Sequence, residues 1–191
     1  PTAYENPLET IASNVLGTAN VLDAARRLFR VKGIIVASSD KAYGKTKRAY
    51  VEEDALRGDH PYEASKSAAD LISLAYAKTN DMPVVVTRFG NIYGEGDLNY
   101  NRIIPGAMMA SITGSTLDLR SDGSFIRDYV YVKDVVQGYL LLLEKMDQAR
   151  GKAFNLSSGE SHTVLEVIKI IEKTLKKKVL YTIKNTQKNE I

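Results

Sequence analysis

The stretch Gly33-Ile34-Ile35-Val36-Ala37-Ser38-Ser39-Asp40-Lys41 decides the fold of this chain. Residues 34–37 form an apolar run without polar alternation, which is typical of a parallel β-strand covered on both faces. A second run of this kind spans residues 82–87. Around these runs, apolar residues recur at helical spacing, as in residues 8–29. The alternation of strands and helices predicts an open parallel α/β sheet, which binds ligands past the carboxyl ends of its strands.

The rest of the chain extends this pattern. The further elements that we expect are helices at residues 62–78, 103–112, 132–146 and 163–175 and strands at residues 117–119, 153–156 and 179–183. Ser161 is the expected N-terminal cap of the last helix. Residues 38–60 are polar and irregular, and residues 89–100 form a glycine-rich loop. Because each of these loops follows a predicted buried strand, both belong to the expected ligand-binding edge.

The composition excludes several classes of function. The chain has 191 residues and no cysteine, which excludes disulfides and thiolate metal sites and predicts a reducing, cytoplasmic location. The net charge of +3 is too small to indicate nucleic-acid binding, and the longest apolar run, residues 139–143, is too short to span a membrane. His60 and His162 have no partner ligands nearby in the sequence, so no metal site is expected. The lysines of residues 173–188 are interpreted as a solvated face, because nucleic-acid binding would require aromatic residues beside them and Tyr181 stands alone.

Tyr62 and Lys66 lie four residues apart on a predicted helix, so their side chains share one face. A phenol titrates near ~10 in water, which is too high for a base at neutral pH. A nearby cation favours the phenolate, so the pair can take a proton from a hydroxyl while hydride leaves the same carbon. Because this spacing also arises by chance, a surface helix pair is the alternative interpretation.

Ser39, Asp40 and Lys41 follow the first predicted strand at its carboxyl end. A hydroxyl at this place can hold the substrate oxygen that Tyr62 deprotonates, and Asp40 beside Lys41 offers a second acid/base pair. Turn and cap chemistry is the alternative for Ser39 and Asp40. A solvated loop lysine is the alternative for Lys41.

Several further motifs accompany these residues in a fixed order. They are residues 14–18 (NVLGT), 38–44 (SSDKAYG), 61–66 (PYEASK), 88–94 (RFGNIYG), 127–132 (RDYVYV) and 154–156 (FNL). Together they resemble the extended short-chain dehydrogenase/reductase family of NAD-dependent epimerases and dehydratases, over nearly the whole chain. The resemblance implies an α/β fold with a partial Rossmann-like, doubly wound parallel sheet. It further implies that residues 1–90 are the C-terminal half of an NAD-binding domain and that residues 91–191 are mainly a small substrate-binding region, interleaved with the sheet.

The resemblance also implies roles in catalysis and in binding the cofactor NAD. Tyr62 would be the catalytic base and would contact the cofactor. Lys66 would bind the nicotinamide ribose and lower the pKa of the tyrosine. Ser39 would be the hydroxyl partner of Tyr62, and Ser38 would belong to the cofactor site.

Three residues of the second half are implied to bind a nucleotide-diphosphate sugar. Asn91 would contact the sugar or its diphosphate, and Arg102 would also contact the substrate. Arg127 would bind the diphosphate, where a planar cation with five donors suits two phosphate oxygens. A turn is the alternative for Asn91, and a simple ion pair with Asp128 is the alternative for Arg127.

Asp40 and Lys41 distinguish two reactions within the family. Sugar 4-epimerases usually carry small neutral residues after the active hydroxyl, whereas 4,6-dehydratases carry an acid and a second acid/base residue. Asp40 followed by Lys41 resembles CDP-glucose 4,6-dehydratases, while residues 126–132 are more similar to dTDP-glucose enzymes and generic epimerases. We therefore expect a 4,6-dehydratase in which Lys41 removes the C5 proton and Asp40 protonates the leaving C6 hydroxyl. A 4-epimerase and a non-catalytic binding or assembly module are the alternatives.

The glycine fingerprint of dinucleotide binding is absent from the sequence. Gly94-Glu95-Gly96 has no matching glycine after it and does not open a helix. The resemblance places the fingerprint before residue 1, so we expect an internal piece of a longer protein that is inactive and binds NAD poorly by itself. Family members commonly dimerise through two helices that correspond to residues 8–29 and 62–78, which predicts a homodimer.

Overall fold

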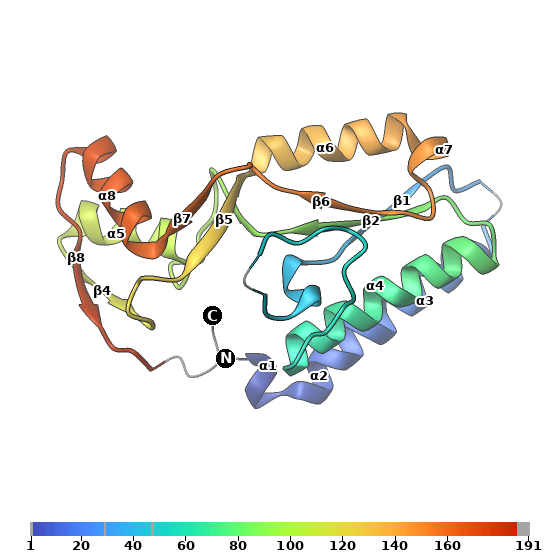
Figure 1. Cartoon of the computed structure of the whole chain (residues 1–191), viewed down its shortest axis with the longest axis horizontal. Coiled ribbons are helices and arrows are strands. Elements are labelled where there is room, and N and C mark those ends of the chain that lie inside the picture. The colour runs from blue at the N-terminus through green and yellow to red at the C-terminus, as the bar shows by residue number, and fades with distance from the viewer. Residues whose placement is uncertain (1, 29, 47, 187–191) are drawn as a thin grey trace. The chain divides into compact units, whose positions relative to one another are not determined.

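The computed structural model describes residues 2–28, 30–46 and 48–186. The chain divides into two compact units. Unit 1 comprises Pro1–Gly90 and Asp134–Leu156, and unit 2 comprises Asn91–Lys133 and Ser157–Ile191. Figure 1 labels the helices and strands of both units.

The described residues of unit 1 form a parallel sheet of three strands in the order β1-β2-β6. The strands are β1 (Ile34–Ala37), β2 (Val84–Phe89) and β6 (Ala153–Leu156). All six residues of the central strand β2 are buried, as a parallel strand with both faces covered requires. The sequence prediction placed β2 two residues too early, because Pro83 has no N–H for the ladder and the pairing with β1 begins at Val84.

Helices cover both faces of this sheet (Figure 1). The helices are α3 (Gly17–Arg26) and α4 (Pro61–Thr79) on one face, and α6 (Val132–Glu144) and α7 (Met146–Ala149) on the other. Leu22 packs against Val84 on the first face, and Leu142 and Met146 pack against Val85 on the second. Neighbouring residues of a strand point to opposite faces, so β2 contributes to both cores. The predicted doubly wound α/β fold is confirmed.

Two expected helices are interrupted. The helix expected at residues 8–29 is preceded by α1 (Thr2–Glu5) and consists of α2 (Pro7–Ile11), a π-helical turn η1 (Ala12–Leu16) and α3. Its expected end at Phe29 lies outside the described residues. The helix expected at residues 132–146 breaks at Lys145, where ψ is 24°, and Met146 then joins the core. Within the described residues, no helix has both the length and the apolar character needed to cross a membrane.

The described part of unit 2 contains two small sheets. In the first, β5 (Ile126–Tyr131) lies between β3 (Asn91–Tyr93), to which it is parallel, and β7 (Ser161–Thr163), to which it is antiparallel. In the second, β4 (Thr116–Leu119) pairs in parallel with β8 (Leu180–Ile183). The helices α5 (Ile103–Thr113) and α8 (Val164–Leu175) pack against these strands around one apolar core.

Three features of unit 2 differ from the sequence prediction. The strand β3 lies inside the expected loop 89–100. The strands β5 and β7 were not predicted, because β5 is defined by its pairing with β3 and β7, which lie far away in the sequence. Ser161 belongs to β7 and does not cap α8. Thr163 caps the helix instead, in a capping box in which its hydroxyl accepts the N–H of Glu166 at 3.1 Å.

Candidate active site

The first part of the candidate site lies where β1 ends. Ser38 continues the sheet, because its N–H donates to a carbonyl of β2 at 2.8 Å, yet its buried hydroxyl has no hydrogen-bond partner among the described residues. Ser39 is also buried and caps the following 3-10 turn, η2 (Asp40–Tyr43), by accepting the N–H of Lys41 at 3.2 Å. The same hydroxyl donates to Asp40 Oδ1 at 3.1 Å. Ser39 therefore has the cap role given above as its alternative, and it touches the neighbouring acid as well.

Asp40 and Lys41 begin η2, and their charged groups lie close together. Lys41 Nζ is 3.9 Å from Asp40 Oδ2, and the two side chains are partly exposed, at 35% and 23% respectively. A carboxylate and an ammonium thus stand side by side directly after Ser39. Such a pair can accept one proton and donate another in a single step.

The turn η2 is held against α4 through its backbone. The carbonyl of Ala42 accepts the hydroxyl of Ser67 at 2.8 Å and the N–H of Arg57 at 3.0 Å. Gly44 ends the turn with φ +74°, and a side chain there would collide with the carbonyl of Arg57. The sequence needs glycine at this position for both reasons.

The helix α4 brings Tyr62 and Lys66 to the same edge of the sheet. Pro61 opens the helix, so Tyr62 lies in its first turn and Lys66 one turn later. Lys66 Nζ lies 6.0 Å from the centre of the Tyr62 ring and donates to the carbonyl of Ala37, the last residue of β1, at 3.1 Å. Burial lowers the pKa of Lys66. The structure therefore places the Lys66 amine at the end of β1, beside Ser38 and Ser39.

Glu63 and His60 support the start of α4, and sequence reasoning gave neither a role there. The buried carboxylate of Glu63 lies 3.1 Å from His60 Nε2 and accepts the N–H of Asp59 at 3.1 Å. Burial raises the pKa of the Glu63 carboxyl. The His60 ring lies 6.4 Å from the Tyr62 ring, between centroids. The sequence signal is a glutamate at the third position of the helix, where its carboxylate can reach back to backbone N–H groups before the helix.

A buried ion pair at the carboxyl end of β2 was also missed. Arg88 donates to both carboxylate oxygens of Asp70 on α4, at 2.8 and 2.9 Å, and to the hydroxyl of Tyr43 at 2.6 Å. Burial by itself lowers the pKa of Arg88, but the hydrogen bonds to Asp70 and Tyr43 outweigh it and hold this pKa above its ordinary value. An arginine inside an otherwise apolar buried strand is the sequence signal, because a buried charge requires a partner.

The candidate substrate residues belong to unit 2. Asn91 lies on β3, and its amide donates to the carbonyl of Asp128 at 3.4 Å. Arg127 lies on the adjacent strand β5, where its guanidinium is 5.3 Å from the Phe125 ring and donates to the carbonyl of Ile126 at 3.0 Å. The two side chains therefore come from neighbouring strands of one sheet.

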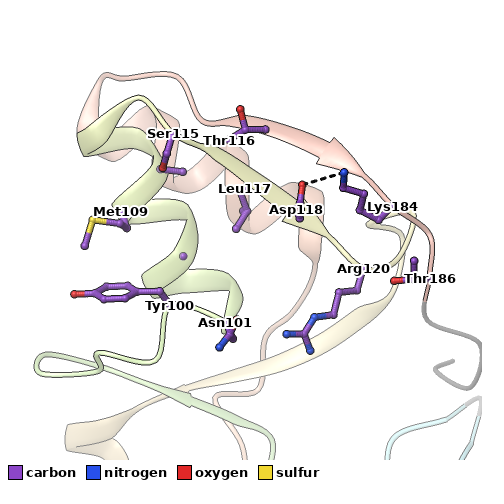
Figure 2. A pocket seen from close by; sticks show the side chains of 12 residues that line it. Tyr100, Asn101, Met109, Ser115, Thr116, Leu117, Asp118, Arg120, Lys184 and Thr186 are labelled. Atoms are coloured by element: carbon purple, nitrogen blue, oxygen red, sulfur yellow. Dashed lines mark ion pairs between the residues drawn. The ribbon is translucent and has the colours of Figure 1, made fainter. Parts of the chain in front are cut away.

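Arg102 precedes α5, is exposed and pairs with an aspartate of the preceding loop at 3.1 Å. Its neighbour Asn101 lines a hollow of about 530 Å³ beside α5 and β4 (Figure 2). In Figure 2 the guanidinium of Arg120 extends toward the side on which Asn101 lies. Asp118 pairs with Lys184 at the rim, at 3.7 Å. Unit 2 thus presents an open hollow lined by both polar and apolar residues, next to a predicted substrate residue.

A parallel sheet between two layers of helices, with hydroxyl, acid and amine groups gathered past its first strand, defines an α/β protein of Rossmann-like fold. Residues 1–157 match the NAD dependent epimerase/dehydratase family, and the chain belongs to this family. The resemblance inferred from the sequence motifs is thereby confirmed.

Similar proteins catalyse more than one reaction. The chain is 30% identical over 178 residues to the trifunctional UDP-glucose 4,6-dehydratase/UDP-4-keto-6-deoxy-D-glucose 3,5-epimerase/UDP-4-keto-L-rhamnose-reductase of Arabidopsis thaliana. The aligned region covers 88% of the chain and 25% of the Arabidopsis protein. The chain is 34% identical over 190 residues to the UDP-glucose 4-epimerase of Mycoplasma genitalium, covering 90% and 56% respectively. The crystal structure of dTDP-glucose 4,6-dehydratase from Bacillus anthracis in complex with NAD matches with a TM-score of 0.83 at 31% identity, covering 91% and 56%. The chain therefore spans about half the length of these relatives, or less.

Proposed function

We propose that this chain carries the catalytic residues of an NAD-dependent nucleotide-sugar 4,6-dehydratase, which converts an NDP-glucose to the 4-keto-6-deoxy sugar. The observation that carries the proposal is the Asp40–Lys41 pair, which directly follows the buried Ser39. Chemistry at C4 needs one proton acceptor, whereas elimination of water across C5 and C6 needs a second base and an acid. The pair supplies both groups.

The groups past the end of β1 fit the cofactor of the family. Ser38 offers a buried hydroxyl that lacks a partner among the described residues. Lys66 has three donors, and the carbonyl of Ala37 takes one of them. We assign Ser38, Tyr62 and Lys66 to NAD binding, with Lys66 on a ribose hydroxyl. When bound, NAD accepts hydride from C4 of the sugar and returns it to C6.

The residues of unit 1 then move the protons. Tyr62 takes the proton of the C4 hydroxyl, with the ammonium of Lys66 favouring the phenolate and Ser39 holding the same oxygen. The resulting C4 ketone acidifies the C5 proton. A proton first passes from the ammonium of Lys41 to the carboxylate of Asp40 within the pair. Lys41 then removes the C5 proton as an amine, while Asp40 gives its proton to the C6 hydroxyl, which leaves as water. The elimination restores the ammonium and the carboxylate of the pair. As the hydride returns to C6, the ammonium of Lys41 gives a proton back to C5, and the proton held by Tyr62 returns to the pair through solvent.

We assign the substrate's nucleotide diphosphate to unit 2 and the cofactor and chemistry to unit 1, in keeping with the predicted division at residue 90. Arg127 binds the diphosphate, because its planar fork matches two phosphate oxygens. Asn91 and Arg102 bind the sugar and the diphosphate, and the hollow beside Asn101 receives the nucleoside. CDP-glucose and dTDP-glucose are the substrates that the sequence favours.

A nucleotide-sugar 4-epimerase is the second candidate function. It is favoured by the identity of 34% with the Mycoplasma genitalium UDP-glucose 4-epimerase. The two functions share Tyr62, Lys66 and Ser39 and differ only in the need for the Asp40–Lys41 pair. The third candidate function is that of a non-catalytic binding or assembly module that has kept the fold. In that case we expect no turnover.

We also propose a homodimer through α2, α3 and α4. These helices, with η1 between α2 and α3, leave large apolar side chains exposed, which are Leu8, Ile11, Leu16, Val21 and Leu71. Exposed apolar side chains on neighbouring helices are typical of a protein interface. Light scattering should give the mass of a dimer for the full-length protein and of a monomer for Val21→Glu combined with Leu71→Glu. Leu98→Glu, at an apolar residue 73% exposed in unit 2, is the control and should leave the dimer intact.

The deciding experiment supplies the full-length gene product with NAD⁺ and with CDP-, dTDP-, UDP- and GDP-hexoses and measures the product mass. Loss of one water from one substrate establishes the dehydratase and names the base. An unchanged mass with inverted C4 stereochemistry makes the protein an epimerase and removes the roles given to Asp40 and Lys41. No conversion of any substrate favours the binding module.

A further inference from the structure

We propose that Asp70, Arg88 and Tyr43 form a relay of buried hydrogen bonds that positions η2, and with it Asp40 and Lys41, for the elimination of water. The inference rests on the proposed dehydratase function. None of the three touches the reacting atoms, so they are positioning residues.

The relay begins on α4 and crosses to β2. The side chains of Asp70 and Arg88 are 0% and 3% exposed, and two hydrogen bonds at 2.8 and 2.9 Å fix the plane of the guanidinium. With this plane fixed, the third nitrogen of Arg88 points to Tyr43, to which it donates at 2.6 Å. The guanidinium carbon also lies 4.8 Å from the centre of the Tyr43 ring.

The polarity of the relay is fixed by its chemistry. Arginine has no acceptor, so the Tyr43 oxygen accepts from Arg88 and its own proton goes to Asn155 Oδ1 on β6, at 2.7 Å. Burial raises the pKa of the Tyr43 phenol, which keeps this proton in place. The ring is clamped as well, because it stacks on Tyr50 with centroids 4.6 Å apart and planes at 10°. Two hydrogen bonds therefore hold the Tyr43 oxygen, and stacking on Tyr50 holds its ring.

The orientation of Asp40 and Lys41 depends on Tyr43 because all three belong to one turn of four residues. A single 3-10 turn has poor hydrogen-bond geometry and little stability of its own. Its position must therefore come from its anchors. The bond from Ser67 to the Ala42 carbonyl holds the backbone at one point, and the Gly44 carbonyl at the end of the turn accepts the Tyr50 hydroxyl at 2.7 Å. The Tyr43 side chain supplies the anchor inside the core, which opposes rotation of the turn.

Stability alone does not account for this arrangement. Replacing a buried ion pair by apolar residues of similar volume is often neutral or stabilising. Four of the six residues of β2 are Val84, Val85, Val86 and Phe89, so an apolar residue at position 88 would continue the strand. Arg88 instead reaches out of the strand to Tyr43, one of the two buried residues of η2.

The test is Tyr43→Phe in the full-length protein, with Tyr139→Phe as the matched control. Both changes remove one phenol hydroxyl in unit 1, but Tyr139 meets only Thr87, at 3.4 Å, among the hydrogen bonds that the described residues show. For Tyr43→Phe we expect kcat for water loss to fall about 10- to 100-fold per folded molecule, with KM nearly unchanged, since small misplacements of catalytic groups have effects of this size. The amides of residues 41–44 should also exchange hydrogen faster. Tyr139→Phe should change neither quantity.

A second variant, Asn155→Ala, removes the acceptor of the relay without altering η2. It should shift kcat and the hydrogen exchange of residues 41–44 in the same direction by a smaller factor, and it decides the question if Tyr43→Phe does not fold. Wild-type kcat and wild-type exchange in both variants would show that the relay positions nothing. If the unaltered protein releases no water from any nucleotide sugar, the dehydratase proposal fails. The hydrogen exchange of residues 41–44 then still tests the relay: faster exchange in the variants shows that the relay holds the turn, and unchanged exchange shows that it does not.

Discussion

The two units hold their candidate site residues in different ways. In unit 1 the Asp40–Lys41 pair is itself partly exposed, but the turn that carries it lies beside a buried pair, Arg88 and Asp70, whose side chains are 3% and 0% exposed. In unit 2 the comparable pair is Arg102 with Asp97, whose side chains are 43% and 19% exposed. Proton transfer tolerates little displacement of its groups, whereas a binding surface built from exposed side chains can change with few structural consequences. The comparison fits the proposal that unit 1 carries the chemistry and unit 2 binds the nucleotide.

The largest effect should come from Tyr62→Phe, which removes the hydroxyl assigned to the base. We expect turnover to fall about 100- to 10,000-fold, the usual contribution of general acid–base catalysis. The measurement is the steady-state rate of substrate conversion by the full-length protein. Tyr76→Phe on the same helix is the control and should retain full activity. Equal activity of the two variants would remove Tyr62 from the mechanism under both the dehydratase and the epimerase proposals.

The next effect compares the two ion pairs directly. Arg88→Leu leaves the carboxylate of Asp70 buried without its partner, which typically costs about 3–5 kcal/mol in the free energy of unfolding. Arg102→Leu breaks an exposed pair, for which the expected loss is about 0–1 kcal/mol. Urea unfolding followed by circular dichroism measures both. Similar losses of unfolding free energy in the two variants would contradict the contrast between the buried pair of unit 1 and the exposed pair of unit 2.

The same contrast explains which parts of the fold followed from the sequence. The strands β1 and β6 were predicted at their observed residues, and α4 within one residue at either end, because continuous apolar runs and helical spacing are local signals. The strands β3, β5 and β7 were not predicted, since each is short or polar and is defined by its partners. Pairing between distant segments leaves no periodic trace in any one of them.

The candidate site shows the same limit. Ser39, Asp40 and Lys41 were found because they follow a recognisable strand, and Tyr62 and Lys66 because four residues separate them on a helix. The link between Asp70 and Arg88 joins a helix to a strand across 18 positions, so no local spacing reveals it. Arg88 could have been noticed only as a charge in a run of buried apolar residues. Its partner and its contact with η2 required the structure.

A smaller effect should appear in unit 2 with Arg127→Lys. Lysine keeps the charge but loses the planar fork that binds two oxygens at once. Loss of one charge-assisted hydrogen bond, worth about 1.5–3 kcal/mol, should raise KM for the nucleotide sugar roughly 10- to 100-fold while kcat stays close to the wild-type value. Arg120→Lys tests whether the hollow shares this role and should raise KM in the same way. If Arg127→Lys lowers kcat and leaves KM unchanged, Arg127 acts in the chemistry and the division of labour between the units is wrong.

The smallest expected effect concerns Glu95 of unit 2, which is exposed and yet has strong partners. The Tyr131 hydroxyl donates to Glu95 at 2.7 Å and Lys133 Nζ lies 3.3 Å away, and together they lower the pKa of Glu95 from its ordinary value of 4.5 to about 2. Because the folded-state pKa lies below the unfolded one, this stabilisation is complete above pH 4.5 and is lost as the pH falls toward 2. Carbon-13 NMR titration of the glutamate carboxyls should show one midpoint near 2, and Tyr131→Phe should move it back toward 4.5 by more than Lys133→Met does. A midpoint near 4.5 in the unaltered protein would show that unit 2 does not hold even its hydrogen-bonded surface groups in place, which would sharpen the contrast with unit 1.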